Sequence, residues 1–83
     1  MSRLGFLILS ILHSNGADNK YQAMTVQEIS DSETLSYEPD TFYRQLKKFV
    51  LDGTVGQGAK DGKCNTYYIT PKGVEMIEEA KRS

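Results

Sequence analysis

The sequence predicts a small α+β domain built from three helices, a two-stranded hairpin and a C-terminal helix. Three observations lead to this prediction. The chain has 83 residues, which is enough for one hydrophobic core and too few for two. Apolar residues recur at helical spacing in its middle, between Pro39 and Gly53. Two strand-like runs then surround Asp61-Gly62. Because of the short length of the chain, residues 1–83 are expected to form a single domain.

The first helix is expected from about residue 3 to residue 14 and is apolar on nearly every face. A helix of this kind must be covered all round. One face can pack on the rest of the domain, while the other either joins the same core or meets a second copy of the chain. Both outcomes remain open, and a homodimer through this helix is one of them. The apolar residues lie within residues 4–12: Leu4, Phe6, Leu7, Ile8, Leu9, Ile11 and Leu12.

A short second helix is expected to begin at a capping box. Thr25 and Glu28 have the spacing at which a Thr hydroxyl accepts from the third helical N–H and a Glu side chain reaches back to the cap. Just before this box, Ala23 and Met24 are expected to pair as a very short strand with the later hairpin. Residues 31–36 are rich in side chains that compete for backbone hydrogen bonds, so a turn is expected there.

The third helix has the clearest boundaries. Pro39 suits its first position, where a missing N–H costs nothing, and Gly53 supplies a left-handed stop. One stripe of this helix is apolar and is expected to be buried: Phe42, Leu46, Phe49 and Val50. The opposite direction carries Asp40, Arg44, Lys47, Lys48 and Leu51, with Thr41 and Tyr43 on its flanks. Taken alone, this basic face is better explained as an ordinary solvated surface, and the elements that follow it in the chain favour a binding surface.

A β-hairpin is expected from the runs at residues 55–59 and 63–69. Asp61-Gly62 suits a type I′ turn between them, with Lys60 and Lys63 on either side. Alternation along the second strand should direct one set of side chains onto the helices and the other set outward. The inward set is Tyr67 and Ile69, and the outward set is Thr66 and Tyr68.

The last helix is expected to start at Thr70-Pro71, with Thr as the cap and Pro at the first helical position. Its apolar positions, which should face inward, are Val74, Ile77 and Ala80. The opposite side is acidic, which makes it a poor surface for nucleic acid. That side carries Glu75, Glu78 and Glu79.

Composition bounds the function. Ten Lys and Arg stand against eleven Asp and Glu, so the net charge is −1 and any affinity for an anion must come from local charge. The single histidine, His13, is far in sequence from Cys64, and no spacing typical of metal ligands or nucleophile pairs is present. We therefore expect neither an enzyme nor a bound metal or cofactor. One cysteine cannot form an internal disulfide, so a cytoplasmic setting is expected.

No membrane span is expected either. The apolar run at residues 4–12 is much shorter than the ~20 residues that a transmembrane helix needs. It is better explained as a buried helix of a small domain.

Three segments together resemble a known class of proteins: TFYRQLKKF at residues 41–49, DGTV at residues 52–55 and YYITPKG at residues 67–73. They resemble winged helix-turn-helix transcriptional regulators, most closely the PadR-like group and more loosely the MarR-like group. The resemblance implies a small winged helix-turn-helix domain that binds double-stranded DNA sequence-specifically, with repression as the expected output. In such regulators the third helix enters the major groove, and the hairpin wing contacts the backbone or the minor groove.

The positions that match these regulators define candidate DNA contacts. Arg44 is the strongest candidate for a base contact, because its guanidinium can pair with guanine through two hydrogen bonds. The other cationic candidates would neutralise phosphates. The full set of candidate contacts is Thr41, Tyr43, Arg44, Lys47 and Lys48 on the helix, and Lys60 and Lys63 on the wing.

A second function remains open: a winged-helix module that binds another protein and no DNA. Fold does not fix function, and a net charge near zero suits this alternative. Glu38, Asp40, Leu51 and Tyr68 would then belong to the partner surface.

Overall fold

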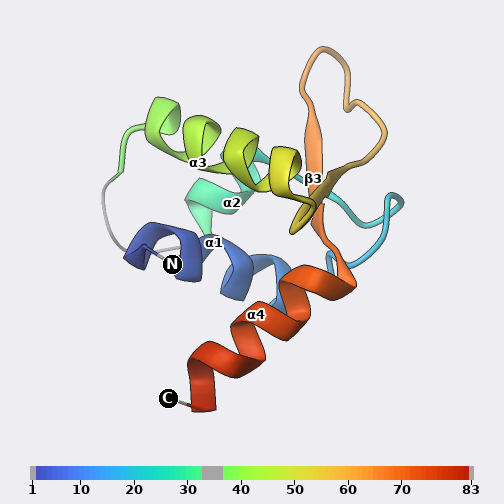
Figure 1. The fold of residues 1–83 in the computed structure, drawn as a ribbon. Coiled ribbons are helices and arrows are strands. Elements are labelled where there is room, and N and C mark those ends of the chain that lie inside the picture. The colour runs from blue at the N-terminus through green and yellow to red at the C-terminus, as the bar shows by residue number, and fades with distance from the viewer. Residues whose placement is uncertain (1, 33–36, 83) are drawn as a thin grey trace.

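The structure, a computed structural model, describes residues 2–32 and 37–82. Its elements follow in the predicted order of three helices, a hairpin and a last helix, together with the short strand predicted before the second helix. The described elements are α1 (Arg3–Ser14), β1 (Met24–Thr25), α2 (Val26–Asp31), α3 (Pro39–Asp52), β2 (Val55–Gln57), β3 (Thr66–Ile69) and α4 (Pro71–Arg82). The α+β prediction is confirmed. In Figure 1, α3 and the hairpin lie at one end of the molecule and α4 at the other.

The first two helices begin where side chains satisfy their free N–H groups. Ser2 Oγ accepts from Gly5 N at 3.0 Å and caps α1. At α2, Thr25 Oγ1 accepts from Glu28 N at 3.1 Å, and Thr25 N donates to Glu28 Oε1 at 3.0 Å. The predicted capping box is therefore confirmed. The turn predicted at residues 31–36 falls largely on residues 33–36, which lie outside the described residues.

The predicted bounds of α3 are also confirmed. Pro39 occupies the first turn, and Gly53 ends the helix with φ of 86°. That left-handed conformation costs glycine little and costs an L side chain more. The helix buries Phe42, Leu46 and Phe49, while Val50 is half-buried. The opposite side of α3 is thereby left to solvent.

The sheet is antiparallel with the order β1-β3-β2. The short first strand pairs with β3 as predicted, but one residue later in the chain, because Thr25 rather than Ala23 is its second member. On the other side of β3, Val55 lies opposite Ile69 and Gln57 opposite Tyr67. The hairpin strands are shorter than predicted, since regular pairing ends at Gln57 and resumes only at Thr66. Residues 58–65 form an extended loop, the wing tip.

The predicted type I′ turn at Asp61-Gly62 is wrong. That turn needs a positive φ at both central residues, and among the described residues only glycines have one. Instead, Asp61 and Cys64 exchange both backbone hydrogen bonds, at 2.9 and 3.0 Å. The central residues are therefore Gly62, with φ of 64°, and Lys63. A positive φ at the first central position is the mark of a type II′ turn, so Lys63 lies within the turn and not beside it.

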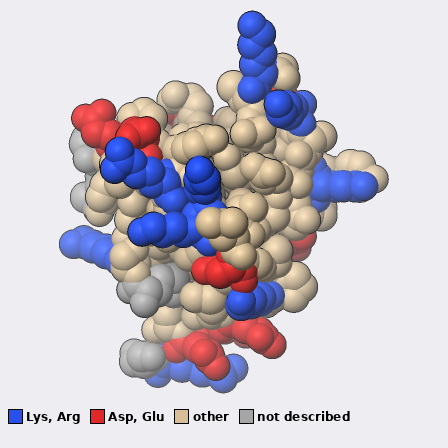
Figure 2. Space-filling model, turned by 45° about the horizontal axis from the view of Figure 1, so that its top comes forward, with Lys and Arg blue, Asp and Glu red and all other residues tan. Residues whose placement is uncertain are grey.

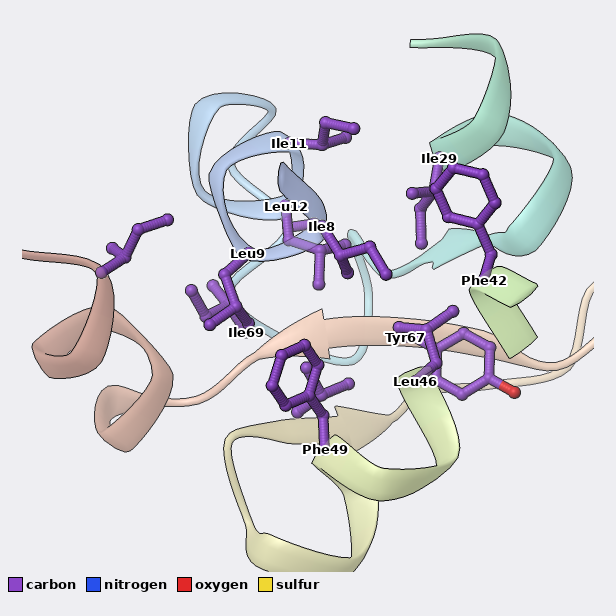
Figure 3. Close-up of a cluster of buried hydrophobic side chains, with 13 residues drawn as sticks. Ile8, Leu9, Ile11, Leu12, Ile29, Phe42, Leu46, Phe49, Tyr67 and Ile69 are labelled. Carbon is purple, nitrogen blue, oxygen red and sulfur yellow. The ribbon is translucent and has the colours of Figure 1, made fainter. Parts of the chain in front are cut away.

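The core is formed where α1, α2 and α3 meet the inner face of β3 and the first turns of α4 (Figure 3). Ile8, Leu9 and Leu12 of α1 are completely buried, as are Ile69 of β3 and Ile77 of α4. Tyr67 also faces this cluster, as predicted, and its hydroxyl oxygen points away from it (Figure 3). Thr66 was expected to face outward, but it is buried, and its hydroxyl donates to Ala59 O across the base of the wing tip. This hydrogen bond offsets the cost of burying the hydroxyl.

The predicted cap and faces of α4 are confirmed. Thr70 Oγ1 accepts from Gly73 N at 3.3 Å. Ile77 is buried and Val74 and Ala80 are half-buried, whereas the three glutamates are exposed. Gly73 lies so close to the backbone of Thr54 that a Cβ at this position would clash with Thr54 O. The start of α4 is therefore packed directly against the chain between α3 and β2.

Hydrogen bonds tie this junction together. Thr54 Oγ1 donates to Asp52 Oδ1 at 2.6 Å, and Thr70 N donates to Thr54 O at 3.1 Å. Two α4-side groups, Thr70 Oγ1 and Lys72 Nζ, reach the last carbonyls of α3, at Gly53 and Asp52. The end of α3, the base of the hairpin and the start of α4 thus form one connected unit, here called the junction.

Candidate nucleic-acid interface

The outer face of α3 presents the predicted side chains to solvent. Arg44, Lys47 and Lys48 are all exposed, as are Thr41 and Tyr43 on the flanks. Figure 2 shows Lys and Arg side chains gathered over α3, with acidic side chains beside them at one edge. Because the buried stripe fixes the rotation of the helix, these five side chains share one accessible face. Whether they contact DNA stays a prediction.

Arg44 does not extend freely from this face. Its Nη2 atom lies 3.2 Å from Asp40 Oδ2, one helical turn away. Both side chains are about three-quarters exposed, at 78% and 74%. Exposed ion pairs of this kind contribute at most about 1 kcal/mol and are screened by salt. The pair therefore orients the guanidinium but is weak enough for Arg44 to leave Asp40 and bind a stronger acceptor.

The wing carries the other predicted cations. Lys60 and Lys63 are exposed, with Lys63 in the tight turn at its end. Lys20, which was not among the predicted site residues, lines the same hollow as Lys60. Glu28 and Asp61 border that hollow too, so the charge there is mixed. The wing supplies a smaller positive field than α3.

A cleft lies between α3 and the hairpin, with a volume of about 220 Å³. This volume is below the ~300–1,000 Å³ of most small-molecule sites. Its lining residues come from both elements and include no carboxylate: Tyr43, Lys47, Val50, Leu51, Gln57 and Tyr67. Leu51 is 81% exposed, so its apolar side chain is accessible to a ligand in the cleft. Gln57 and Tyr67 were not among the predicted site residues, because only the packing of α3 on β2 brings them beside Lys47.

Tyr67 forms part of the wall of this cleft. Burial raises the pKa of its phenol above the ordinary value of 10.0, and the nearby Tyr43 phenol acts in the same direction. Hydrogen bonds with the side chains of Gln57 and Asn65 oppose this increase in pKa. The net effect keeps the hydroxyl protonated well above neutral pH, so it stays able to donate a hydrogen bond.

This raised pKa predicts an alkaline loss of stability. Below about pH 10 the phenol is protonated in the folded and unfolded chains, so it contributes no pH dependence. Above that pH the unfolded chain loses the proton first, and the free energy of unfolding should fall. In circular dichroism melts, the decrease in Tm between about pH 8 and pH 11 should be smaller for Tyr67→Phe than for the wild type. Tyr21→Phe removes an exposed phenol and is the control; an equal decrease in all three proteins would contradict the assignment.

Metal-binding groups and reactive side chains are sparse in the described residues, 2–32 and 37–82. No group of three or more His, Cys, Asp or Glu side chains there could hold a metal ion. His13 is exposed at the end of α1, and Cys64 is exposed on the wing tip. Of the described helices, none is long and apolar enough to span a membrane.

Known proteins resemble the chain in sequence and in structure. No protein-family model matches it. The DNA-binding protein TubR of a Clostridium botulinum C phage is 32% identical over 73 residues, which make up 88% of this chain and 88% of that protein. Among solved structures, TubR from Bacillus megaterium matches with a TM-score of 0.84 and 24% identity, over all of this chain and 89% of that one.

The predicted resemblance to winged-helix regulators is confirmed at the level of the fold. A PadR family transcription regulator from Clostridium difficile has a TM-score of 0.75 to this structure. Its sequence is 18% identical, and the match covers 98% of this chain and 85% of that protein. The arrangement of α3 beside a hairpin is therefore shared with a regulator of the group that the sequence resembled most.

Proposed function

Because the chain belongs to the TubR family of DNA-binding proteins, we propose that it is a sequence-specific regulator that binds double-stranded DNA. In this proposal α3 enters the major groove, and the wing contacts the backbone or the minor groove. The observation that carries it is the exposed basic face of α3 beside the wing, on one side of the molecule (Figure 2). The relative that is 32% identical is named a DNA-binding protein, which supports this function over a protein-interaction module without DNA binding.

The chemistry is binding and release, without covalent steps. Lysines that neutralise phosphates release condensed counterions, which supplies affinity on any sequence. Side chains of α3 that reach base edges then select among sequences. The net charge of −1 makes the local field of α3 decisive, since the chain as a whole does not attract an anion.

Fluorescence anisotropy with duplex DNA tests the proposal. The wild type should bind a duplex selected from a random pool, and its affinity should fall steeply as salt is raised. Lys60→Ala and Lys63→Ala should each lower the affinity on selected and unrelated duplexes alike, and should flatten the salt dependence by about one unit of slope. Gln27→Ala, an exposed change on α2, serves as the control. Absence of duplex binding at low salt would refute the function.

We also propose that two copies of the chain act together through α1. The outer side of this helix carries half-buried Phe6 and Leu7. A second copy would cover this apolar surface. A domain of this size gains stability from such cover, because its own core is small.

Sedimentation analysis tests the dimer. Leu7→Glu should shift the protein from dimer to monomer, because it would place a charge in the interface. Its circular dichroism spectrum should stay helical, since Leu7 is only half-buried in the single chain. Glu78→Gln on the exposed side of α4 is a control that should leave the dimer intact. If the wild type sediments as a monomer at every concentration, the dimer proposal is wrong.

Two finer points complete the proposal. Repression is the expected output, because a protein seated in the major groove excludes other proteins from the same DNA. The cytoplasm is the proposed location, since the one cysteine, Cys64, cannot form the internal disulfide typical of oxidising compartments.

A further inference from the structure

The cleft between α3 and the hairpin combines features that suit part of a nucleic-acid strand. Val50 and Leu51 form an apolar surface along one side, and Leu51 is left almost fully open. Lys47 brings a positive charge to the same cleft, and no carboxylate lines it. An occupant that is apolar in part and negatively charged in part would match both features.

Hydroxyl and amide groups complete the polar side. The side chains of Gln57 and Asn65 lie near enough to the Tyr67 hydroxyl to lower its pKa through hydrogen bonding. Tyr43 lies near enough to affect the ionisation of that phenol, so the two tyrosines stand on the same cleft. Tyr43 is 46% exposed, which leaves it accessible to a ligand. These groups can donate hydrogen bonds to an anion beside Lys47.

The position of the cleft narrows the choice of occupant. It lies between the two elements that, on the proposed function, enter or border neighbouring grooves of one duplex. The DNA strand that separates those grooves must pass between α3 and the wing. One unit of that strand has an apolar sugar and an anionic phosphate, and a cleft of about 220 Å³ is too small for most larger ligands.

We propose that this cleft seats one sugar–phosphate unit of the DNA backbone, with Lys47 and the Tyr43 hydroxyl at the phosphate and Leu51 against the sugar. The inference rests on the proposed function. It adds Gln57 and Tyr67 as residues that shape the seat, and it assigns Leu51, an exposed apolar residue, to DNA. The seat would fix how far α3 can slide along the groove.

The helix offers a matched control for Lys47. Lys48 is the next residue, carries the same charge and is exposed, but it does not line the cleft. If the lysines act only through their charge, neither Lys47→Ala nor Lys48→Ala should have an effect that depends on one particular phosphate. If the cleft holds one phosphate, the effect of Lys47→Ala should depend on the charge of that phosphate, and the effect of Lys48→Ala should not.

Duplexes with single methylphosphonate substitutions separate these possibilities. On a selected duplex, Lys47→Ala should weaken binding about tenfold and Tyr43→Phe about threefold, as expected for one charged and one neutral hydrogen bond. One particular methylphosphonate should weaken the wild type and abolish the further effect of both substitutions. Leu51→Ala should weaken binding without removing the sensitivity to that phosphate. Lys48→Ala should keep its full effect on the same modified duplex.

Each outcome decides the matter. Coupling of Lys47 and Tyr43 to the same single phosphate would support the seat. Coupling to different phosphates, or equal behaviour of Lys47→Ala and Lys48→Ala, would overturn it while leaving the DNA-binding function intact. Full affinity in both Leu51→Ala and Tyr43→Phe would also overturn the seat, because neither side chain would then contact the DNA. Absence of any duplex binding by the wild type would refute the proposed function, and the seat with it.

Discussion

Replacing Phe42 with alanine is expected to lower the free energy of unfolding by about 3–5 kcal/mol, the usual cost of truncating a buried phenylalanine. The side chain is completely buried and joins α3 to α2. It also meets Tyr37 edge to face, with ring centroids 5.8 Å apart. Since domains of this kind are stable by only about 5–15 kcal/mol, the variant should be close to unfolding at moderate temperature.

Urea denaturation monitored by circular dichroism measures this effect. Tyr43→Ala is the natural control, because it removes the adjacent aromatic side chain from the exposed face of the same helix. It should cost less than about 1 kcal/mol, as most surface substitutions do. Similar losses in the two variants would mean that α3 does not bury the stripe that contains Phe42.

Arg44→Ala should produce the largest loss of sequence-specific binding, about 1–3 kcal/mol on a selected duplex and much less on unrelated DNA. A guanidinium that pairs with a guanine edge through two hydrogen bonds discriminates between bases, whereas a phosphate contact does not. Anisotropy titrations on both duplexes measure the difference. Equal losses of binding free energy on the two duplexes would mean that Arg44 contacts a phosphate and not a base.

The ion pair with Asp40 makes a second, opposite prediction. Asp40→Asn removes a carboxylate that lies 3.2 Å from Arg44 and that would repel nearby phosphates, so affinity should rise. In the Arg44→Ala background the same change should help less, because one of its two benefits is gone. A gain that is identical in both backgrounds would show that the pair does not restrain Arg44. Glu78→Gln on α4 is a distant control.

Local sequence signals predicted the helices well. The bounds of α3 follow from Pro39 and Gly53, and the start of α2 follows from the Thr25–Glu28 capping box. Each of these signals acts within four residues or less, so the surrounding fold cannot easily override it. The exposed face of α3 was predictable for the same reason, since helical geometry and one buried stripe determine it.

The hairpin was harder to predict, because its details depend on contacts between distant residues. The observed turn lies one residue later in the chain than predicted, because Gly62 occupies its first central position with a positive φ. In the predicted turn Asp61 would have needed this unfavourable backbone conformation. The buried hydroxyl of Thr66 donates to Ala59 O, seven residues away. The cleft was beyond sequence reasoning altogether. Nothing in the local pattern places Gln57 or Tyr67 beside Lys47.

The junction holds the wing rigidly at its base and leaves its tip less restrained. The base of the wing is anchored where Thr54 and Thr70 connect α3 to α4. Beyond Gln57 the regular ladder ends, and the described bonds across the wing tip are those of Thr66 with Gly58 and Ala59 and the Asp61–Cys64 bridge. Stiffness should decrease from Gln57 toward Lys63. A flexible tip can contact phosphates in several positions, so it does not determine where the protein sits on the DNA. The tip lysines would therefore add affinity for any duplex, while the anchored base of the wing beside α3 would determine the position of the protein on the DNA.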